Sequence, residues 1–364
     1  MKRFFAIVIV LILVAAGAAA AWVFLGVRQV YRGYGASEQF VEIKPGTGTR
    51  AIGQRLAAAG VVRDELTFRI ALWMSGKATR LKAGEYRFTD PETPGNVIDK
   101  LARGDVFVIV LTIPEGLSVK ETAKIVEAKG FGPASAFVDA ARDTSPVHSI
   151  DPAARDLEGY LFPETYPLSR HADAAGIVRL MAEAFNRALS PELRAAAAAR
   201  GLSIRQLVTL ASIVEKETGK PEERPLVASV YENRLRIGMP LQCDPTVIYA
   251  LEQLGRYHGN LHHDDLSFDS PYNTYRYPGL PPGPIAAPGR ASLDAVVHPA
   301  DSNYLYFVSR NDGSHEFAAT LDEHNRNVQK YQVEYFRAGG AGKAGAAGGS
   351  GRPGGGGKTG KANR

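Results

Sequence analysis

The sequence predicts an α+β protein in which an N-terminal transmembrane helix precedes a small α/β region and a larger mixed α+β domain. Three observations predict it: an uncharged apolar run at the N-terminus, a strand–turn–helix pattern that occurs twice, and later helices separated by loops rich in Pro and Gly. The 364 residues are 45% hydrophobic, which is enough for one or two domain cores and excludes a wholly disordered chain.

The apolar run at residues 4–26 is predicted to be a transmembrane anchor. As a helix it would span about 34 Å, and a bilayer core is about 30 Å thick. Lys2 and Arg3 precede the run, which favours a cytoplasmic N-terminus with the rest of the chain outside the cytoplasm. The alternative is a cleaved signal peptide, because small residues fill positions 15–21. The run continues to Leu25, past any such cleavage point, which favours the anchor.

A strand, a Gly turn, an amphipathic helix and a final Gly follow one another at residues 43–60 and again at residues 113–130. A further strand pattern at residues 83–88 and a short helix at residues 96–102 lie between the two copies. Small modules of this kind outside the membrane resemble LysM carbohydrate-binding modules. Residues 38–108 are therefore interpreted as a LysM-like region.

The most informative predicted helix lies within residues 203–219, where a capping box precedes an apolar stripe and a Gly ends it. Glu215 and Glu217 fall on opposite borders of the stripe. Burial at such a border raises the pKa of a carboxyl group, which suits a general acid. The alternative for either glutamate is a salt bridge with Arg224 or Arg234. The helix pattern does not choose between the two glutamates.

Amides, tyrosines and rigid loops follow this helix and are typical of a glycan-binding site. Amide groups hydrogen-bond sugar hydroxyls, aromatic faces stack on pyranose rings, and Pro and Gly fix the loops. The alternative is a set of structural loops that lead to a final strand at 304–308. The segments concerned are 233–235, 241–246, 272–275 and 279–285.

Other kinds of site lack the residues they need. Cys243 is the one cysteine, which excludes an intrachain disulfide and a multi-cysteine zinc site. The neighbouring Asp244 disfavours a Cys243 thiolate nucleophile. His258, His262 and His263 have scattered partners and are expected at the surface. Because a phosphate-binding Gly-rich loop and a Gly-x-Ser-x-Gly elbow are also missing, we expect neither a metal nor a cofactor.

The net charge of +5 comes from the C-terminal end. The chain has 43 Lys and Arg against 38 Asp and Glu, and residues 338–364 contain five basic residues and no acidic one. Residues 1–337 are therefore neutral overall, so we expect no nucleic-acid partner. The Gly-rich segment 338–364 has no Leu, Ile, Val or aromatic residue and is predicted to be a disordered basic tail.

Several segments together resemble the endolytic murein transglycosylases, the MltG or YceG-like family. The resemblance runs from the membrane segment to about residue 336, in the family's order, and leaves out the tail. The motifs that carry it are EGYLFPETY at 158–166, ASIVEKET at 211–218, NRL at 233–235, DPTVIY at 244–249, YNTY at 272–275 and GLPPGPI at 279–285.

The resemblance implies a single-pass protein of the cell inner membrane with a periplasmic catalytic domain at residues 109–337. Enzymes of the family cleave glycan strands of peptidoglycan internally, between N-acetylmuramic acid and N-acetylglucosamine, without using water. The 1,6-anhydro end that they leave terminates or limits strand elongation. The implied partners are glycan strands, the membrane, and peptidoglycan synthases of the elongation or division machinery.

The resemblance assigns catalysis to Glu217, the second Glu of the Glu-Lys-Glu motif. A protonated Glu217 would donate to the leaving glycosidic oxygen and then take the proton of the muramyl 6-hydroxyl, so that a second carboxylate is not needed. Cys243 stands where a small polar residue is expected. Polarity and motif membership give the substrate-binding candidates Gln242, Asp244, Thr246, Tyr272, Asn273 and Tyr275.

Two other functions stay open at this point. One is a non-catalytic, membrane-anchored scaffold that binds peptidoglycan through the repeated modules. The other is hydrolysis, with Asp244 as a second carboxylate beside Glu217. The products released from peptidoglycan would distinguish all three functions.

Overall fold

The computed structural model describes residues 2–335 and 337 and divides the chain into two compact units. Of the described residues, the first unit comprises 2–111 and 166–172, and the second comprises 112–165, 173–335 and 337. The predicted disordered tail, 338–364, lies outside the described residues. Helices and three two-stranded sheets in the described part make a mixed α+β protein, as the sequence predicts.

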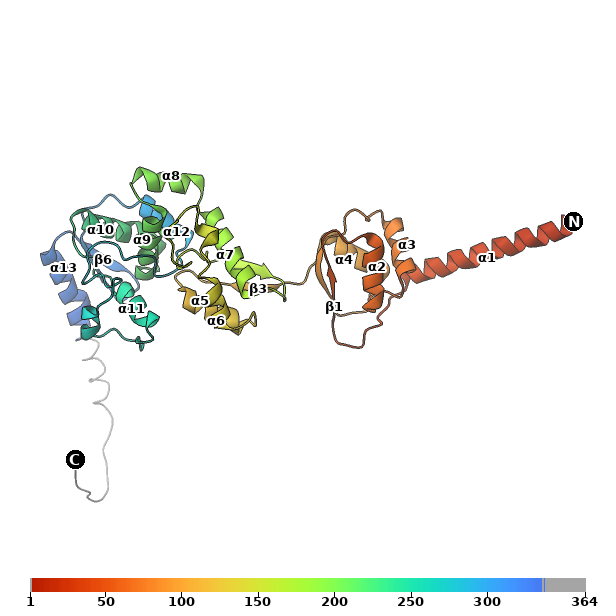
Figure 1. Cartoon of the computed structure of the whole chain (residues 1–364), viewed down its shortest axis with the longest axis horizontal. Coiled ribbons are helices and arrows are strands. Elements are labelled where there is room, and N and C mark those ends of the chain that lie inside the picture. The colour runs from red at the N-terminus through yellow and green to blue at the C-terminus, as the bar shows by residue number, and fades with distance from the viewer. Residues whose placement is uncertain (1, 336, 338–364) are drawn as a thin grey trace, which may run out of the picture. The chain divides into compact units, whose positions relative to one another are not determined.

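The chain begins with a long apolar helix, α1 (Lys2–Arg28), drawn in red in Figure 1. Within the described residues it is the one helix long and apolar enough to cross a membrane, with a mean hydropathy of 2.8 over an 18-residue window within residues 7–28. The side chains of Leu11, Leu13 and Val14 are exposed. Near its end, Val27 packs against the core of the first unit, so the apolar helix continues directly into a folded unit.

In the first unit, two helices lie between two antiparallel strands along the chain, and a third helix follows the second strand. Strands β1 and β2 pair with Val41 opposite Tyr86, and both of these side chains are buried. The core continues through Leu56 on α2, Phe68 on α3 and Leu101 on α4. In chain order the elements are β1 (Gln39–Ile43), α2 (Thr49–Ala58), α3 (Glu65–Ser75), β2 (Gly84–Phe88) and α4 (Pro94–Arg103).

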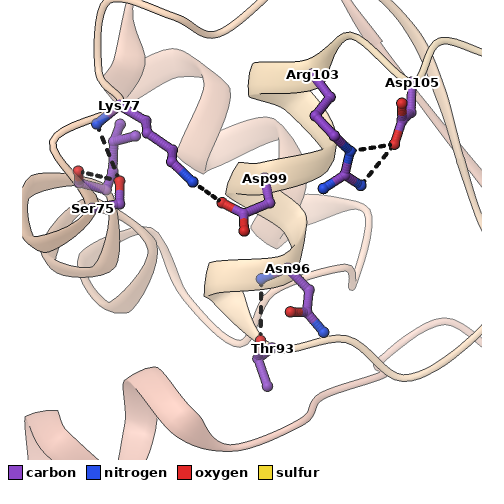
Figure 2. Close-up of polar contacts among 8 residues, drawn as sticks. Ser75, Lys77, Thr93, Asn96, Asp99, Arg103 and Asp105 are labelled. Carbon is purple, nitrogen blue, oxygen red and sulfur yellow. Dashed lines mark hydrogen bonds and ion pairs between the residues drawn. The ribbon is translucent and has the colours of Figure 1, made fainter.

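Apolar packing rather than ion pairing holds α4 in place. Lys77 binds Asp99 at 2.6 Å, and Arg103 binds Asp105 at 2.7 Å. Figure 2 shows both pairs. Both pairs are exposed to solvent, where an ion pair contributes less than about 1 kcal/mol to stability. The opposite face of the helix is fully buried through Val97, Ile98 and Leu101.

The repeated strand–turn–helix pattern is confirmed. In the second copy, β3 (Ile109–Thr112) precedes α5 (Val119–Ala128), as β1 precedes α2 in the first. Each glycine of the pattern adopts a left-handed backbone conformation, which other residues rarely do. The φ angles are 78° at Gly46, 70° at Gly60, 77° at Gly116 and 83° at Gly130.

The second unit is built around α9 (Ile204–Glu217), which packs against the helices α8, α10, α11 and α12 (Figure 1). Residues 207–214 of α9 are all buried, as expected for a central helix. The predicted capping box is present at Ser203 and Gln206. The remaining elements are α6 (Ala134–Ala140), β4 (Thr165–Leu168), α7 (Ala174–Ala188), α8 (Pro191–Ala199), α10 (Arg224–Arg236), α11 (Asp244–Gln253), α12 (Arg290–Val297), β5 (Tyr306–Ser309), β6 (His315–Ala318) and α13 (Leu321–Val328).

The aromatic segment at residues 158–166 begins with a buried residue, Glu158, which connects two helices. Glu158 accepts hydrogen bonds from the backbone N–H of Val119 at 3.0 Å and from the hydroxyl of Tyr249 at 3.2 Å. Burial raises the pKa of Glu158 to about 8, so the carboxyl is largely neutral at pH 7. Glu158 therefore joins the start of α5 to α11 and supports the region beside the candidate site.

Candidate active site

A polar cleft of about 450 Å³ opens in the second unit at the C-terminal end of α9. Helices α10, α11 and α13, strand β5 and the loop at 272–275 contribute its other walls. Its polar and aromatic lining residues are Glu217, Tyr231, Arg234, Gln242, Asp244, Tyr275, Tyr306, Phe307, His324 and Asn325. Both Glu217 and three of the predicted substrate-binding residues thus lie in one cavity.

Glu217 is the last residue of α9 and is half-buried in this cleft. Burial raises its pKa, and the negative end of the helix dipole acts in the same direction. Hydrogen bonds oppose the shift: the hydroxyl of Tyr231 donates to Oε1 at 2.6 Å, and the Cys243 thiol lies within hydrogen-bonding reach. A carboxyl group with a raised pKa that faces an open cleft is suited to general acid catalysis.

Glu215 occupies a different environment from Glu217. Its carboxylate binds Arg224 at 3.1 Å and accepts hydrogen bonds from the backbone N–H of Gly289 at 3.0 Å and from the Ser292 hydroxyl at 2.8 Å. Only 6% of the Glu215 side chain is exposed. Glu215 therefore ties α9 to α10 and α12, and it does not line the cleft.

Gln242, Asp244 and Tyr275 line the cleft together with Glu217. The hydroxyl of Tyr275 donates to Oδ1 of Asp244 at 2.5 Å. Asp244 lies in the first turn of α11, where the free backbone N–H groups favour a negative charge. Gln242 has a φ of 51°, which is uncommon for a residue with a side chain, and its N–H binds the carbonyl of Thr274 at 3.2 Å.

The other three predicted substrate-binding residues lie outside this cleft. Thr246 is fully buried and donates to the carbonyl of Cys243 at 2.7 Å. Asn273 is also fully buried, and its amide donates to carbonyls of the 266–268 loop. Tyr272 lines a separate cavity of about 110 Å³ beside Pro284. Thr246 and Asn273 hold the loops that carry the cleft residues, and contact of all three with substrate stays a prediction.

Cys243 is buried next to the candidate acid. Burial raises the pKa of its thiol well above the ordinary value, and the nearby Glu217 acts in the same direction. A protonated thiol can donate to the carboxylate but is a poor nucleophile. The geometry thus gives Cys243 a supporting position beside Glu217.

The sequence interpretation missed several cleft residues. Tyr231 and Arg234 lie three positions apart on α10, so they share one face of the helix, and this spacing was a usable signal. Tyr306, His324 and Asn325 come from β5 and α13, far along the chain. Their spacing in the sequence does not indicate that they line the same cleft. Within residues 2–335 and 337, no group of three His, Cys, Asp or Glu side chains is arranged to hold a metal ion.

Comparison with known proteins decides the family. Residues 41–330 match the model of the YceG-like family. The chain belongs to this family. The matched range contains Glu217 and all six predicted substrate-binding residues, whereas it leaves out α1 and residues 338–364.

The relatives of this YceG-like chain agree with the family match. It is 31% identical over 307 residues to an endolytic murein transglycosylase of Bacillus subtilis, covering 80% of this chain and 84% of the relative. It is 32% identical over 321 residues to an endolytic murein transglycosylase of Streptococcus pneumoniae, of which the match spans only 58%. A crystal structure of a putative YceG-like protein from Listeria monocytogenes has a TM-score of 0.55 and 31% identity, covering 80% of this chain and 98% of that one.

We expect Tyr231→Phe to change the pH dependence of catalysis. The Tyr231 hydroxyl stabilises the ionised form of Glu217, so its loss raises the pKa of Glu217 further. Because a general acid must be protonated, activity declines as pH rises through this pKa, and that decline should move to higher pH in the variant. Rate measurements across pH on a glycan substrate test this.

Tyr249→Phe is the matched control, since Tyr249 donates to a different buried carboxyl, Glu158, and does not line the cleft. Its pH profile should coincide with that of the unmodified protein. A Tyr231→Phe profile that also coincides would contradict the role of this hydrogen bond.

Proposed function

We propose that the chain is a membrane-anchored, endolytic lytic transglycosylase of peptidoglycan. It cleaves the bond between N-acetylmuramic acid and N-acetylglucosamine within nascent strands, forms 1,6-anhydro ends and thereby limits strand elongation. The observation that carries the proposal is the position of Glu217, a half-buried carboxyl with a raised pKa in an open polar cleft. Two relatives that carry the name endolytic murein transglycosylase support it.

The proposed reaction uses one carboxyl group twice. Protonated Glu217 donates its proton to the glycosidic oxygen as the bond to C1 of the muramyl residue breaks, and the sugar develops oxocarbenium character. The Glu217 carboxylate then takes the proton of the muramyl 6-hydroxyl as the oxygen of that hydroxyl attacks C1. The nucleophile belongs to the substrate, so its attack is intramolecular. Glu217 ends protonated, ready for another turnover.

The hydrogen bonds around Glu217 suit both steps. Burial holds the proton on the carboxyl before bond cleavage, and the hydroxyl of Tyr231 stabilises the carboxylate that forms. Asp244 and Tyr275 form a hydrogen-bonded pair in the same cleft. We assign Gln242, Asp244 and Tyr275 to substrate binding, because their polar groups face the space in which a sugar would lie.

One observation favours a second candidate function. Asp244 and Glu217 line the same cleft, and most glycoside hydrolases use two carboxyl groups for catalysis. In that case Asp244 would activate water or act as the nucleophile. The Tyr275 hydroxyl donates a hydrogen bond to one of the two carboxylate oxygens of Asp244. This hydrogen bond favours a role of Asp244 in substrate binding over one as nucleophile or base.

Two further parts of the proposal concern location and the first unit. The apolar α1 supports a single-pass anchor in the inner membrane, with Lys2 and Arg3 on the cytoplasmic side and the second unit in the periplasm. The strand–helix–helix–strand order of β1, α2, α3 and β2 supports a LysM-like module. Contact with peptidoglycan synthases stays a prediction from the resemblance.

Mass spectrometry of products tests the proposal. The full chain in detergent is incubated with uncrosslinked glycan strands, and the released fragments are weighed. Fragments that end in 1,6-anhydro-muramic acid support the transglycosylase, since they are lighter by one water than reducing ends. Reducing ends would establish hydrolysis, and strands that are bound without being cut would establish a scaffold.

A further inference from the structure

The cleft is lined by two carboxyl groups, those of Glu217 and Asp244, and by one guanidinium group, that of Arg234. We call the part of the lining around Arg234 and the Tyr306 ring the basic end. Arg234 is 8% exposed, and no salt bridge joins it to a carboxylate among the described residues, although the charge of Glu217 acts on it from within the same cleft. Nε donates to the carbonyl of Leu305 at 2.6 Å, and Nη1 donates to that of Leu241 at 2.7 Å. These bonds leave Nη2 free to donate to a ligand in the cleft.

A second polar group near this end also lacks a partner. Nδ1 of His324 is buried and has no hydrogen bond. The imidazole stacks on Tyr306, with ring centres 5.1 Å apart, and the guanidinium of Arg234 lies 5.4 Å from the centre of the same Tyr306 ring. Burial and the charge of Arg234 lower the pKa of His324, so the imidazole is neutral at pH 7. Asn325 follows on α13 and adds an amide to the wall.

An almost buried cation that no carboxylate binds directly destabilises the free cleft, and an anionic ligand bound to it would lower that cost. Guanidinium groups match carboxylates in both charge and shape. The neighbouring imidazole and amide supply the hydrogen bonds that a desolvated carboxylate requires. This end of the cleft is therefore suited to a carboxylate rather than to a neutral sugar.

We propose that Arg234, His324 and Asn325 form a subsite for a carboxylate of the stem peptide on the muramyl residue that is cleaved. This inference rests on the proposed function. The glycan backbone of peptidoglycan is made of N-acetylated sugars, whereas its carboxylates belong to the peptide linked to the muramyl lactyl group. Occupation of the subsite places that peptide at the basic end of the cleft, and it makes strands that carry peptides better substrates than bare glycan.

Paired substrates test the subsite with the unmodified full chain in detergent. One substrate is a glycan polymer with complete stem peptides. The second is the same polymer after an amidase has removed the peptides and the lactyl carboxylates that this frees have been converted to methylamides, and the third carries D-isoglutamine in place of D-glutamate. We expect kcat/KM to be at least about tenfold higher on the first than on the second. An intermediate value on the third would identify the glutamate carboxylate as one of the groups bound. Equal kcat/KM on the first two would overturn the proposal.

Variants assign the preference to particular residues. Arg234→Met should bring the ratio of kcat/KM between peptide-bearing and bare strands close to one, and Arg234→Lys should retain part of it. Asn325→Ala changes an exposed residue, so the protein should fold, and it should lower the ratio by several-fold. Arg179→Met, which removes an exposed arginine on α7, should leave the ratio unchanged.

A full preference retained by both Arg234→Met and Asn325→Ala would overturn the assignment to these residues. Failure of the unmodified chain to cut any of the substrates would instead contradict the proposed function and the subsite with it. The ratio is the informative readout, because a variant that folds poorly loses activity on all strands equally.

Discussion

Glu217→Gln should lower the rate of glycan cleavage by about 10²–10⁴-fold, the usual contribution of a general acid. Glutamine has the same shape as glutamic acid but cannot donate a proton to the glycosidic oxygen or accept one from the 6-hydroxyl. Its amide oxygen still accepts the hydrogen bond from Tyr231, so the cleft should keep its form. The rate is measured as release of fragments from uncrosslinked glycan by the full chain.

Folding and binding controls make this result interpretable. The unfolding midpoint of Glu217→Gln should equal or exceed that of the unmodified protein, because the substitution replaces a carboxyl whose ionisation is already disfavoured by burial. The variant should also still bind glycan strands. Undiminished cleavage by the variant would contradict the assignment of Glu217 as the general acid.

Glu215→Gln should have the opposite effect, with a large loss of stability and little loss of catalysis by folded molecules. Breaking a buried ion pair leaves an uncompensated charge and costs about 3–5 kcal/mol. Here Arg224 keeps Glu115 as a second, more exposed partner at 3.6 Å, so we expect the lower end, about 3 kcal/mol. Urea unfolding followed by a spectroscopic signal of the second unit measures this.

The two glutamate variants form a matched pair. They make the same chemical change two positions apart on one helix, yet the structure assigns one to the cleft and the other to the joint between α9, α10 and α12. Cleavage per folded molecule should survive in Glu215→Gln and be lost in Glu217→Gln. Equal losses of both properties in both variants would contradict the separation of roles.

The predictions from sequence succeeded where the signal is local. The capping box of α9 and the repeated Gly turns depend on residues within a few positions of one another, and the structure confirms both. The apolar run of α1 is likewise visible in composition alone. Each of these features is decided by hydrogen bonds and side-chain periodicity within a single segment.

The predictions were coarser where the partners are distant in the chain. Motif membership grouped Tyr272, Asn273 and Tyr275, which are neighbours in sequence, yet only Tyr275 reaches the cleft. Consecutive loop residues point in different directions, and polarity does not reveal which of them is needed to hold the loop. Asn273 is such a residue, since its amide satisfies two buried carbonyls.

The sequence by itself determined the mixed α+β character, the apolar N-terminal helix and the resemblance to the YceG-like family, because these depend on composition, local pattern and ordered motifs. It also placed Glu215 and Glu217 at equivalent borders of one apolar stripe. Only the tertiary structure distinguished them: Arg224, Gly289 and Ser292 surround Glu215, whereas Glu217 faces an open cleft. The physical reason is that desolvation and hydrogen bonding depend on side chains brought together from distant parts of the chain, which a single helix pattern does not contain.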